Sequence, residues 1–296
     1  MSTNPAVSVV AVVVTFNRKE LLQECLAALF AQTAPLSRII VVDNASTDGT
    51  RALIESSNFA KRPAFQYVQM ETNTGGAGGF QAGMELALKY GADWIWVMDD
   101  DVAAEPTALE ELLRYKGLSE CIHPSRTLPD GSAFEWEQIF DPATTARCHL
   151  HDVSFKNGKE FCVVTVACFE GMLISANLTR KIGVPRGEYF IGDDDTLYGF
   201  KASLHTNVLY IRSARLRKLL APPTQMTAFK AYFAVRNKLW MHKEIRRLGV
   251  LDNSVHLRFR IYYPFYVLRL ILSNFRAATL TAVFRGIRDG MSAPGH

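Results

Sequence analysis

The chain has 296 residues, 48% hydrophobic and 21% charged, which suits one large α/β domain with an appended segment. Residues 1–210 carry 26 acidic and 17 basic side chains, whereas residues 211–296 carry 3 acidic and 16 basic ones. No run of 18 or more uncharged apolar residues occurs, so the sequence predicts no membrane-spanning helix.

Four runs that predict strands alternate with helical patterns in the first hundred residues. The runs cover residues 9–16, 38–43, 65–70 and 94–98. This alternation predicts a parallel, Rossmann-like half-sheet. The first run has no basic residues before it, so we expect a strand there rather than a signal peptide. Asn17 is the expected N-cap of the helix that begins near Arg18.

The fourth run ends in Asp99, Asp100 and Asp101. Carboxylates at the carboxyl end of a parallel strand favour a ligand site, and adjacent carboxylates favour a divalent cation with oxygen ligands. Alternate residues of an extended chain point to one side, so Asp99 and Asp101 are expected to share the metal while Asp100 points elsewhere. The alternative is that Asp100 or Asp101 caps the next helix.

Thr15 and Asp43 end two other predicted parallel strands, so both fall on the same sheet edge as Asp99. Asp43 suits a ribose or a uracil, or it caps the next helix. Gly75 and Gly76 open a helix where backbone N–H groups can approach a phosphate. No G-x-G-x-x-G follows the first strand and no Walker lysine is present, so neither an NAD site nor a P-loop is predicted.

Several segments together resemble one enzyme family. They are VVVTFNR, VVDNAS, the aspartate triplet, ETNTGGAGGF, EGMLIS, EYFIGDDDTLYGFKA, YFAVRNKLW and FRGIRDG. The chain resembles the family 2 inverting glycosyltransferases of GT-A fold, and more narrowly the bacterial galactofuranosyltransferases of the galactan-initiating type. The fold that this implies is an α/β GT-A domain, with a Rossmann-like nucleotide-binding half, an acceptor half and a C-terminal helical segment.

The resemblance also implies site residues and a cofactor. Asp99 and Asp101 would hold Mn²⁺ or Mg²⁺, and Asp100 would face the donor sugar. The expected donor-binding residues are Thr15, Asn17, Arg18, Asp43, Asn73, Gly75, Gly76, Asp99, Asp100, Asp101 and Arg236. The expected acceptor-binding residues are Trp136, Glu170 and Gly171. Residues 116–159 show weak patterning and favour an exposed irregular connection, with an acceptor surface as the alternative.

A second acidic cluster, Asp193 to Asp195, precedes a predicted helix. An inverting transfer needs a general base, and crowded carboxylates raise the proton affinity of one member. By the resemblance Asp195 is the expected base and Asp194 the second choice. The alternative is a helix N-terminus that attracts acidic residues. This chain departs from the family pattern at Leu197, where an acidic residue is expected, and it lacks the usual histidine ligand, with His205 the nearest candidate.

The C-terminal segment combines apolar and aromatic residues with regularly placed arginines, including Arg258, Arg260, Arg269 and Arg276. Such a segment suits a helix lying in the headgroup layer of an anionic membrane. A helical hairpin packed on the catalytic domain, or a dimer interface, is the alternative. Nucleic acid is not expected, because the catalytic body is acidic and contains no recognised binding motif.

The resemblance implies one function, and two rivals stay open. We expect a GT-A domain at residues 1–215 and a membrane-associating segment at residues 216–296, with galactofuranose moved from UDP-galactofuranose to a lipid-linked or polysaccharide acceptor of the cell envelope. The rivals are a rhamnosyltransferase using dTDP-rhamnose and a non-catalytic assembly subunit. The five cysteines show no C-x-x-C spacing, so reduced thiols and a cytoplasmic location are expected. The C-terminal segment adds a peripheral position on the inner face of the cell membrane. A homo-oligomer is left open.

Overall fold

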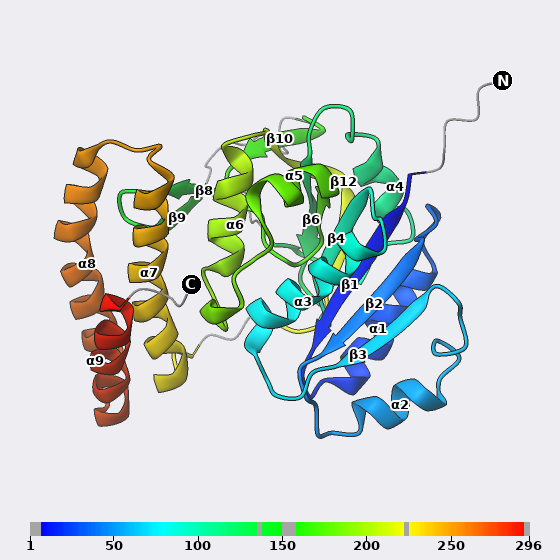
Figure 1. Cartoon of the computed structure of the whole chain (residues 1–296), viewed down its shortest axis with the longest axis horizontal. Helices are drawn as coiled ribbons and strands as arrows, with labels where there is room; N and C mark the ends of the chain where they lie inside the picture. The colour runs from blue at the N-terminus through cyan, green and yellow to red at the C-terminus, as the bar shows by residue number, and fades with distance from the viewer. Residues whose placement is uncertain (1–6, 135–137, 150–157, 222–224, 293–296) are drawn as a thin grey trace.

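The computed structural model describes residues 7–134, 138–149, 158–221 and 225–292. Within them, ten strands form one mixed sheet in the order β10-β12-β6-β11-β4-β1-β2-β3, with β5 beside β12 and β7 beside β6. Figure 1 shows this sheet with helices on both faces and a three-helix bundle to one side, with α7 nearest the sheet. None of the described helices combines the length and the hydrophobicity needed to cross a bilayer.

The predicted half-sheet is present. Its parallel strands are β1 (Val9–Thr15), β2 (Arg38–Asp43), β3 (Phe65–Gln69) and β4 (Trp94–Asp99). Thr15 lies opposite Asp43, and Val14 lies opposite Asp99, so the strands end together at one edge. The β-branched side chains of β1 and β2 are buried on both faces of the sheet, which is why these two runs are almost continuously apolar.

Helices cover both faces of this half. The connecting helices are α1 (Lys19–Phe30), α2 (Thr50–Ser56) and α3 (Gly75–Lys89). Leu22 and Leu26 of α1 join the core on one face, and Phe80 and Met84 of α3 join the core on the other. Helix α3 lies close to β1, because a Cβ at Gly79 would fall 2.5 Å from the side chain of Val14.

The second half completes the sheet. Its elements are β5 (Val102–Ala104), α4 (Ala108–Leu113), β6 (Cys121–Thr127), β7 (Ala133–Phe134), β8 (Gln138–Asp141), β9 (Ala146–His149), β10 (Phe161–Val164), β11 (Met172–Ser175), α5 (Ala176–Ile182), the 3₁₀ helix η1 (Gly187–Tyr189), α6 (Asp194–Ser203) and β12 (Val208–Lys218). Strand β11 pairs antiparallel with β4, and β12 reaches the same edge.

The prediction of an exposed connection over residues 116–159 is wrong in its first part. Strand β6 lies between β12 and β11, and its His123 is fully buried. Both nitrogens of the His123 ring contact backbone oxygens, those of Pro124 and Cys168. Because β6 contains histidine, proline and arginine, its sequence shows no apolar pattern, and the strand is recognised only from its pairing with β12 and β11.

Three helices follow the sheet: α7 (Ala228–Leu248), α8 (Asn253–Ser273) and α9 (Ala277–Met291). Trp240 and Met241 of α7 pack against Tyr189 and Phe200 of the second half of the sheet domain, and α8 and α9 pack on the other side of α7. A Cβ at Gly290 of α9 would lie 3.2 Å from the Cα of Arg236 in α7, so these two backbones nearly touch.

Candidate active site

The end of β4 carries three consecutive aspartates, and the fold brings a further carboxylate to two of them. Asp99, Asp101 and Glu170 each offer an oxygen within 4.8 Å of the other two. Glu170 stands just before β11, whose pairing with β4 places it there. Three oxygens at this spacing suit Mg²⁺ or Mn²⁺. Glu170, expected at the acceptor, thus lies beside the expected metal pair.

Two further observations fit a divalent cation in this group. Burial, followed by repulsion from Asp101 and Glu170, raises the pKa of Asp99 well above its ordinary value. One buried carboxylate oxygen of Asp101 has no hydrogen-bond partner among the described residues. A cation would stabilise ionised Asp99 and take that oxygen as a ligand. Neither His205 nor another described histidine belongs to the group.

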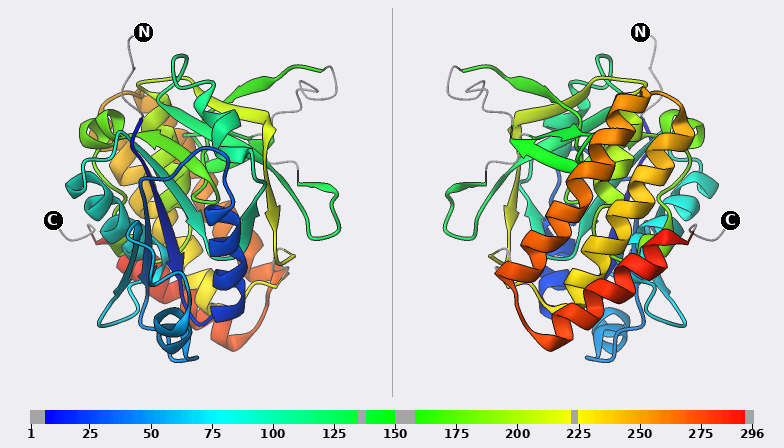
Figure 2. Two further views of the ribbon diagram at one scale, coloured as in Figure 1. Left: turned by 90° about the vertical axis from the view of Figure 1, so that its right-hand side faces the viewer. Right: turned by 90° about the vertical axis from the view of Figure 1, so that its left-hand side faces the viewer.

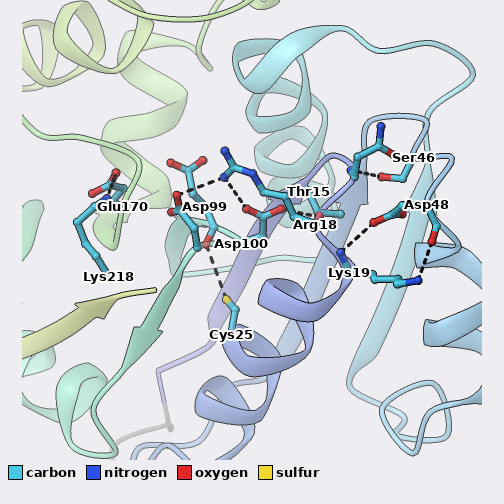
Figure 3. A network of polar contacts seen from close by, with 12 residues as sticks. Thr15, Arg18, Lys19, Cys25, Ser46, Asp48, Asp99, Asp100, Glu170 and Lys218 are labelled. Carbon is cyan, nitrogen blue, oxygen red and sulfur yellow. Dashed lines mark hydrogen bonds and ion pairs between the residues drawn. The ribbon is translucent and has the colours of Figure 1, made fainter. Parts of the chain in front are cut away.

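Glu170 is held in its ionised form by two buried cations. Arg126 forms an ion pair with one carboxylate oxygen, and Nζ of Lys218 lies 2.7 Å from the other. Burial acts to raise the pKa of Glu170, but the charges of Arg126 and Lys218 lower it below its ordinary value. Figure 3 shows Glu170 and Lys218 on one side of Asp99 and Arg18 on the other.

Asp100 turns toward β1 instead of toward this group. Its carboxylate accepts a 2.7 Å hydrogen bond from the Thr15 hydroxyl and lies 3.2 Å from Arg18, which contacts Asp101 at the same distance. Burial raises the pKa of Asp100 to about 6, although Thr15 and Arg18 oppose the rise. The alternative that Asp100 or Asp101 caps the next helix is wrong, since β5 intervenes and Thr107 is the N-cap of α4.

Asp43 is completely buried at the end of β2. It accepts hydrogen bonds from the Tyr67 hydroxyl and, at 2.9 Å, from the backbone N–H of Ser46. The Tyr67 contact was not foreseen, because it joins two neighbouring strands. Asp43 therefore shapes the loop after β2, and its contact with a nucleotide remains a prediction.

Asn17 does not cap α1, contrary to the expectation. It adopts a positive φ of 53°, and its side-chain oxygen accepts a 2.7 Å hydrogen bond from the N–H of Thr47. The first N–H of α1, that of Lys19, is instead bonded by Asp48 at 3.1 Å. The two residues tie the loops after β1 and β2 together, and this gives the expected nucleotide edge a fixed shape.

The glycine-rich turn before α3 supports another loop. The N–H of Gly75 donates to the Asn73 side chain at 2.8 Å, and Asn44 donates to the Gly75 carbonyl at 2.8 Å. A Cβ at Gly75 would fall 2.0 Å from the carbonyl oxygen of Phe190, so this glycine lets residues 187–192 pass close by. Gly76 has open space at its Cβ position, and its approach to a phosphate remains a prediction.

The second acidic cluster opens α6. Burial and the charge of Asp195 raise the pKa of Asp194 to about 8, and Asp194 lines a small pocket with Lys201 and Glu244. Burial also raises the pKa of Asp195, although Arg147 opposes the rise. One carboxylate oxygen of Asp195 accepts hydrogen bonds from the backbone N–H and the hydroxyl of Thr196, at 2.6 and 3.1 Å. Its role as the base remains a prediction.

Arg236 and Asn237 of α7 hold the segment that leads into this cluster. Arg236 donates to the carbonyls of Glu188 and Tyr189 at 2.8 and 2.7 Å. Asn237 donates to the carbonyls of Tyr189, Ile191 and Gly192 at 3.1, 3.0 and 2.7 Å. Both side chains are buried. Arg236, predicted to bind the donor, is therefore engaged in positioning this loop.

Of the two other expected acceptor residues, the structure describes only Gly171. Gly171 is buried with φ of 102°, its N–H donates to Val97 at 2.8 Å, and its carbonyl accepts from Trp96 at 2.9 Å. It anchors the turn that presents Glu170. Trp136 lies outside the described residues.

The half-sheet, the acidic end of β4 and the mixed second half define a glycosyltransferase of GT-A fold. The glycosyl transferase family 2 model matches residues 10–181, and the chain belongs to this family. Galactofuranosyltransferase GlfT1 of Mycolicibacterium smegmatis is a relative with 32% identity over an alignment of 205 positions, which covers 63% of this chain and 62% of GlfT1. The aligned part therefore spans less than two thirds of that relative.

Solved structures support the fold at low sequence identity. Staphylococcus aureus TarS 1–349 in complex with UDP-GlcNAc has a TM-score of 0.65 and 13% identity, covering 96% of this chain and 80% of that one. Mannosyltransferase PcManGT from Pyrobaculum calidifontis, in complex with GDP-Man and Mn²⁺, has a TM-score of 0.57 and 16% identity, covering 99% and 77%. At such identities the likeness establishes the GT-A fold.

Proposed function

We propose that the protein is an inverting galactofuranosyltransferase that uses UDP-galactofuranose. The observation that carries the proposal is the convergence of Asp99, Asp101 and Glu170 at the carboxyl edge of the half-sheet. It occurs in a family 2 chain related to a galactofuranosyltransferase. The acceptor is a lipid-linked or polysaccharide glycan of the cell envelope, such as O-antigen, capsule or galactan, and the enzyme works on the inner face of the membrane.

Asp99, Asp101 and Glu170 are the residues that would hold Mn²⁺ or Mg²⁺. When bound, the ion acts as a Lewis acid that stabilises the charge developing on the departing nucleoside diphosphate. Arg126 and Lys218 keep Glu170 ionised and oriented. Arg18 holds Asp100 and Asp101 at 3.2 Å, so the triplet keeps its shape before the donor arrives.

Asp195 serves as the general base. It takes the proton of the acceptor hydroxyl while the oxygen attacks the anomeric carbon, and the bond from that carbon to the diphosphate breaks on the opposite face. Inversion follows from this in-line geometry. The raised pKa of Asp195 improves its proton affinity at the moment of attack. Arg236 and Asn237 hold the preceding loop, which fixes where Asp195 stands.

Calorimetric titration of the purified protein with UDP-galactofuranose and with dTDP-rhamnose, each with Mn²⁺ and with a chelator, tests the donor. We expect binding of UDP-galactofuranose that depends on Mn²⁺. Preference for dTDP-rhamnose would identify a rhamnosyltransferase of the same enzyme class. Binding of neither donor would favour a non-catalytic assembly subunit.

A further inference from the structure

Helix α8 presents an unusual outer face. Its exposed residues include five large apolar ones, spaced four, four, three and four positions apart, which places them on one side of the helix. They form the α8 stripe: Leu257, Ile261, Phe265, Leu268 and Leu272, with exposed fractions from 52% to 68%. Phe275, in the turn that follows, is 73% exposed.

The stripe cannot turn inward without breaking the bundle. The opposite side of α8 carries Phe259, Tyr263, Val267 and Leu270, which are buried in a cluster with Val235 of α7 and Val283 of α9. The Tyr263 hydroxyl donates to the Val235 carbonyl at 3.2 Å. The right-hand view of Figure 2 shows α8 running along the outer side of the bundle. One apolar face of α8 is thus used internally, and the stripe is a second one.

The charges that α8 itself carries have a single sign. From Asn253 to Arg288 the sequence contains six arginines and neither aspartate nor glutamate, while Asp252 caps α8 and Asp289 pairs with Arg288 at 2.8 Å. All six are exposed: Arg258, Arg260, Arg269, Arg276, Arg285 and Arg288. At 100° per residue, Arg258 and Arg269 flank one edge of the stripe and Arg260 flanks the other. A helix lying in a membrane interface can place such an apolar strip at the acyl boundary while the arginines that border it reach the headgroups.

Charge decides between the two available partners. A second copy of the chain docking through the same face would bring two sets of arginines together, and that repulsion opposes association. An anionic bilayer attracts the arginines and accepts the apolar side chains. We propose that the α8 stripe inserts into the headgroup and acyl boundary of an anionic bilayer, with α8 lying along the surface. This rests on the proposed function for its purpose, since a lipid-linked acceptor is held at that surface.

Flotation of the full chain with vesicles, without donor or metal, tests the docking. We expect the protein to float with phosphatidylglycerol-containing vesicles, less with phosphatidylcholine alone, and less in high salt. Phe265→Asp should weaken binding about tenfold or more, because it removes a large apolar group and adds an anion. Leu118→Asp is the matched control, since Leu118 is also 66% exposed but lies between α4 and β6, in the second half of the sheet domain.

A second pair of variants tests the charges separately. Arg258→Gln with Arg269→Gln should reduce binding to phosphatidylglycerol vesicles and leave residual binding to phosphatidylcholine unchanged. Equal flotation of wild type, Phe265→Asp and Leu118→Asp would overturn the proposal. So would a dimer in lipid-free buffer, measured by light scattering, that Phe265→Asp dissociates.

The two proposals can fail separately. Docking is measured without donor, so flotation would be unchanged even if UDP-galactofuranose proved not to be the donor. Conversely, Phe265→Asp should bind the donor in solution as the wild type does, because Phe265 lies in α8 and not at the sheet edge. A matching thermal midpoint for Phe265→Asp and Leu118→Asp would confirm that both variants are folded.

Discussion

The two acidic clusters differ in what surrounds them. The first, Asp99 to Asp101 with Glu170, has cations in direct contact: Arg18, Arg126 and Lys218. The second, Asp193 to Asp195, has the pKa values of Asp194 and Asp195 raised by burial and by neighbouring carboxylates. Burial raises the pKa values of Asp99 and Asp100 as well, so the clusters differ in their contacts with cations, which bring the pKa of Glu170 alone below its ordinary value.

This difference separates two kinds of chemistry on one fold. Arg126 and Lys218 keep Glu170 ionised as an oxygen ligand, and a divalent cation beside it would stabilise ionised Asp99 too, whereas the raised pKa of Asp195 gives that carboxylate a proton affinity suited to a base. The supports differ as well. The first cluster extends a core strand, and the second depends on a loop held by α7.

The largest expected effect separates the base from the ion site. Asp195→Asn should lower kcat about 1,000-fold, because a general base contributes on that order, and should leave donor affinity unchanged. Steady-state kinetics with calorimetric donor titration measures both. If Asp194→Asn lost activity and Asp195→Asn kept it, the base would be Asp194. Loss of donor affinity in Asp195→Asn would contradict the assignment of donor binding to the first cluster and of proton transfer to the second.

Removing a ligand from the first cluster should affect binding instead. Asp101→Ala should weaken Mn²⁺-dependent donor binding about 100-fold, since Lewis-acid contact with the diphosphate is worth several kcal/mol. A chelator should do the same to the wild type. Asp93→Ala is the matched control, because Asp93 precedes β4 at its other end, where its carboxylate accepts a 2.9 Å hydrogen bond from the N–H of Ser8. Equal donor affinity in Asp101→Ala and Asp93→Ala would exclude an ion at the triplet.

The support of the second cluster gives a smaller effect. Asn237→Ala removes three hydrogen bonds to the loop before Asp193 and should lower kcat about tenfold, since each such bond contributes about 1 kcal/mol to holding the loop. The donor KM should not change. Hydrogen exchange should speed up in residues 187–195.

Tyr263→Phe is the control for this variant. It removes a buried hydrogen bond between α8 and α7 and leaves the loop alone. The same loss of kcat in both variants would point to the stability of the bundle rather than to the position of the base.

The smallest expected effect is a change in pH dependence. The base must be ionised, so kcat/KM should fall as the pH falls through the pKa of Asp195, which lies above the ordinary aspartate value. The charge of Asp193 contributes to that rise, so Asp193→Asn should move the acid limb to lower pH with little change in the maximal rate. A shift in the opposite direction would contradict the electrostatic account of this cluster.

The sequence predicts the part of the site that follows from local pattern. Apolar runs that alternate with helical patterns identified the four parallel strands, and their shared edge placed Thr15, Asp43 and Asp99 together. The arrival of Glu170 depends on antiparallel pairing of β11 with β4, residues more than seventy positions apart. Arg126 sits in a strand without an apolar pattern. Such contacts come from tertiary pairing, which a local pattern does not encode.

The near contact of α9 with α7 has a mechanical consequence. Gly290 packs against the backbone of Arg236, the residue that holds the carbonyls of Glu188 and Tyr189. The three C-terminal helices and the loop before Asp193 are therefore joined by direct contacts. With α8 lying on the lipid surface, these contacts set the distance between the reacting centre and the bilayer, and an acceptor glycan must be long enough to span that distance.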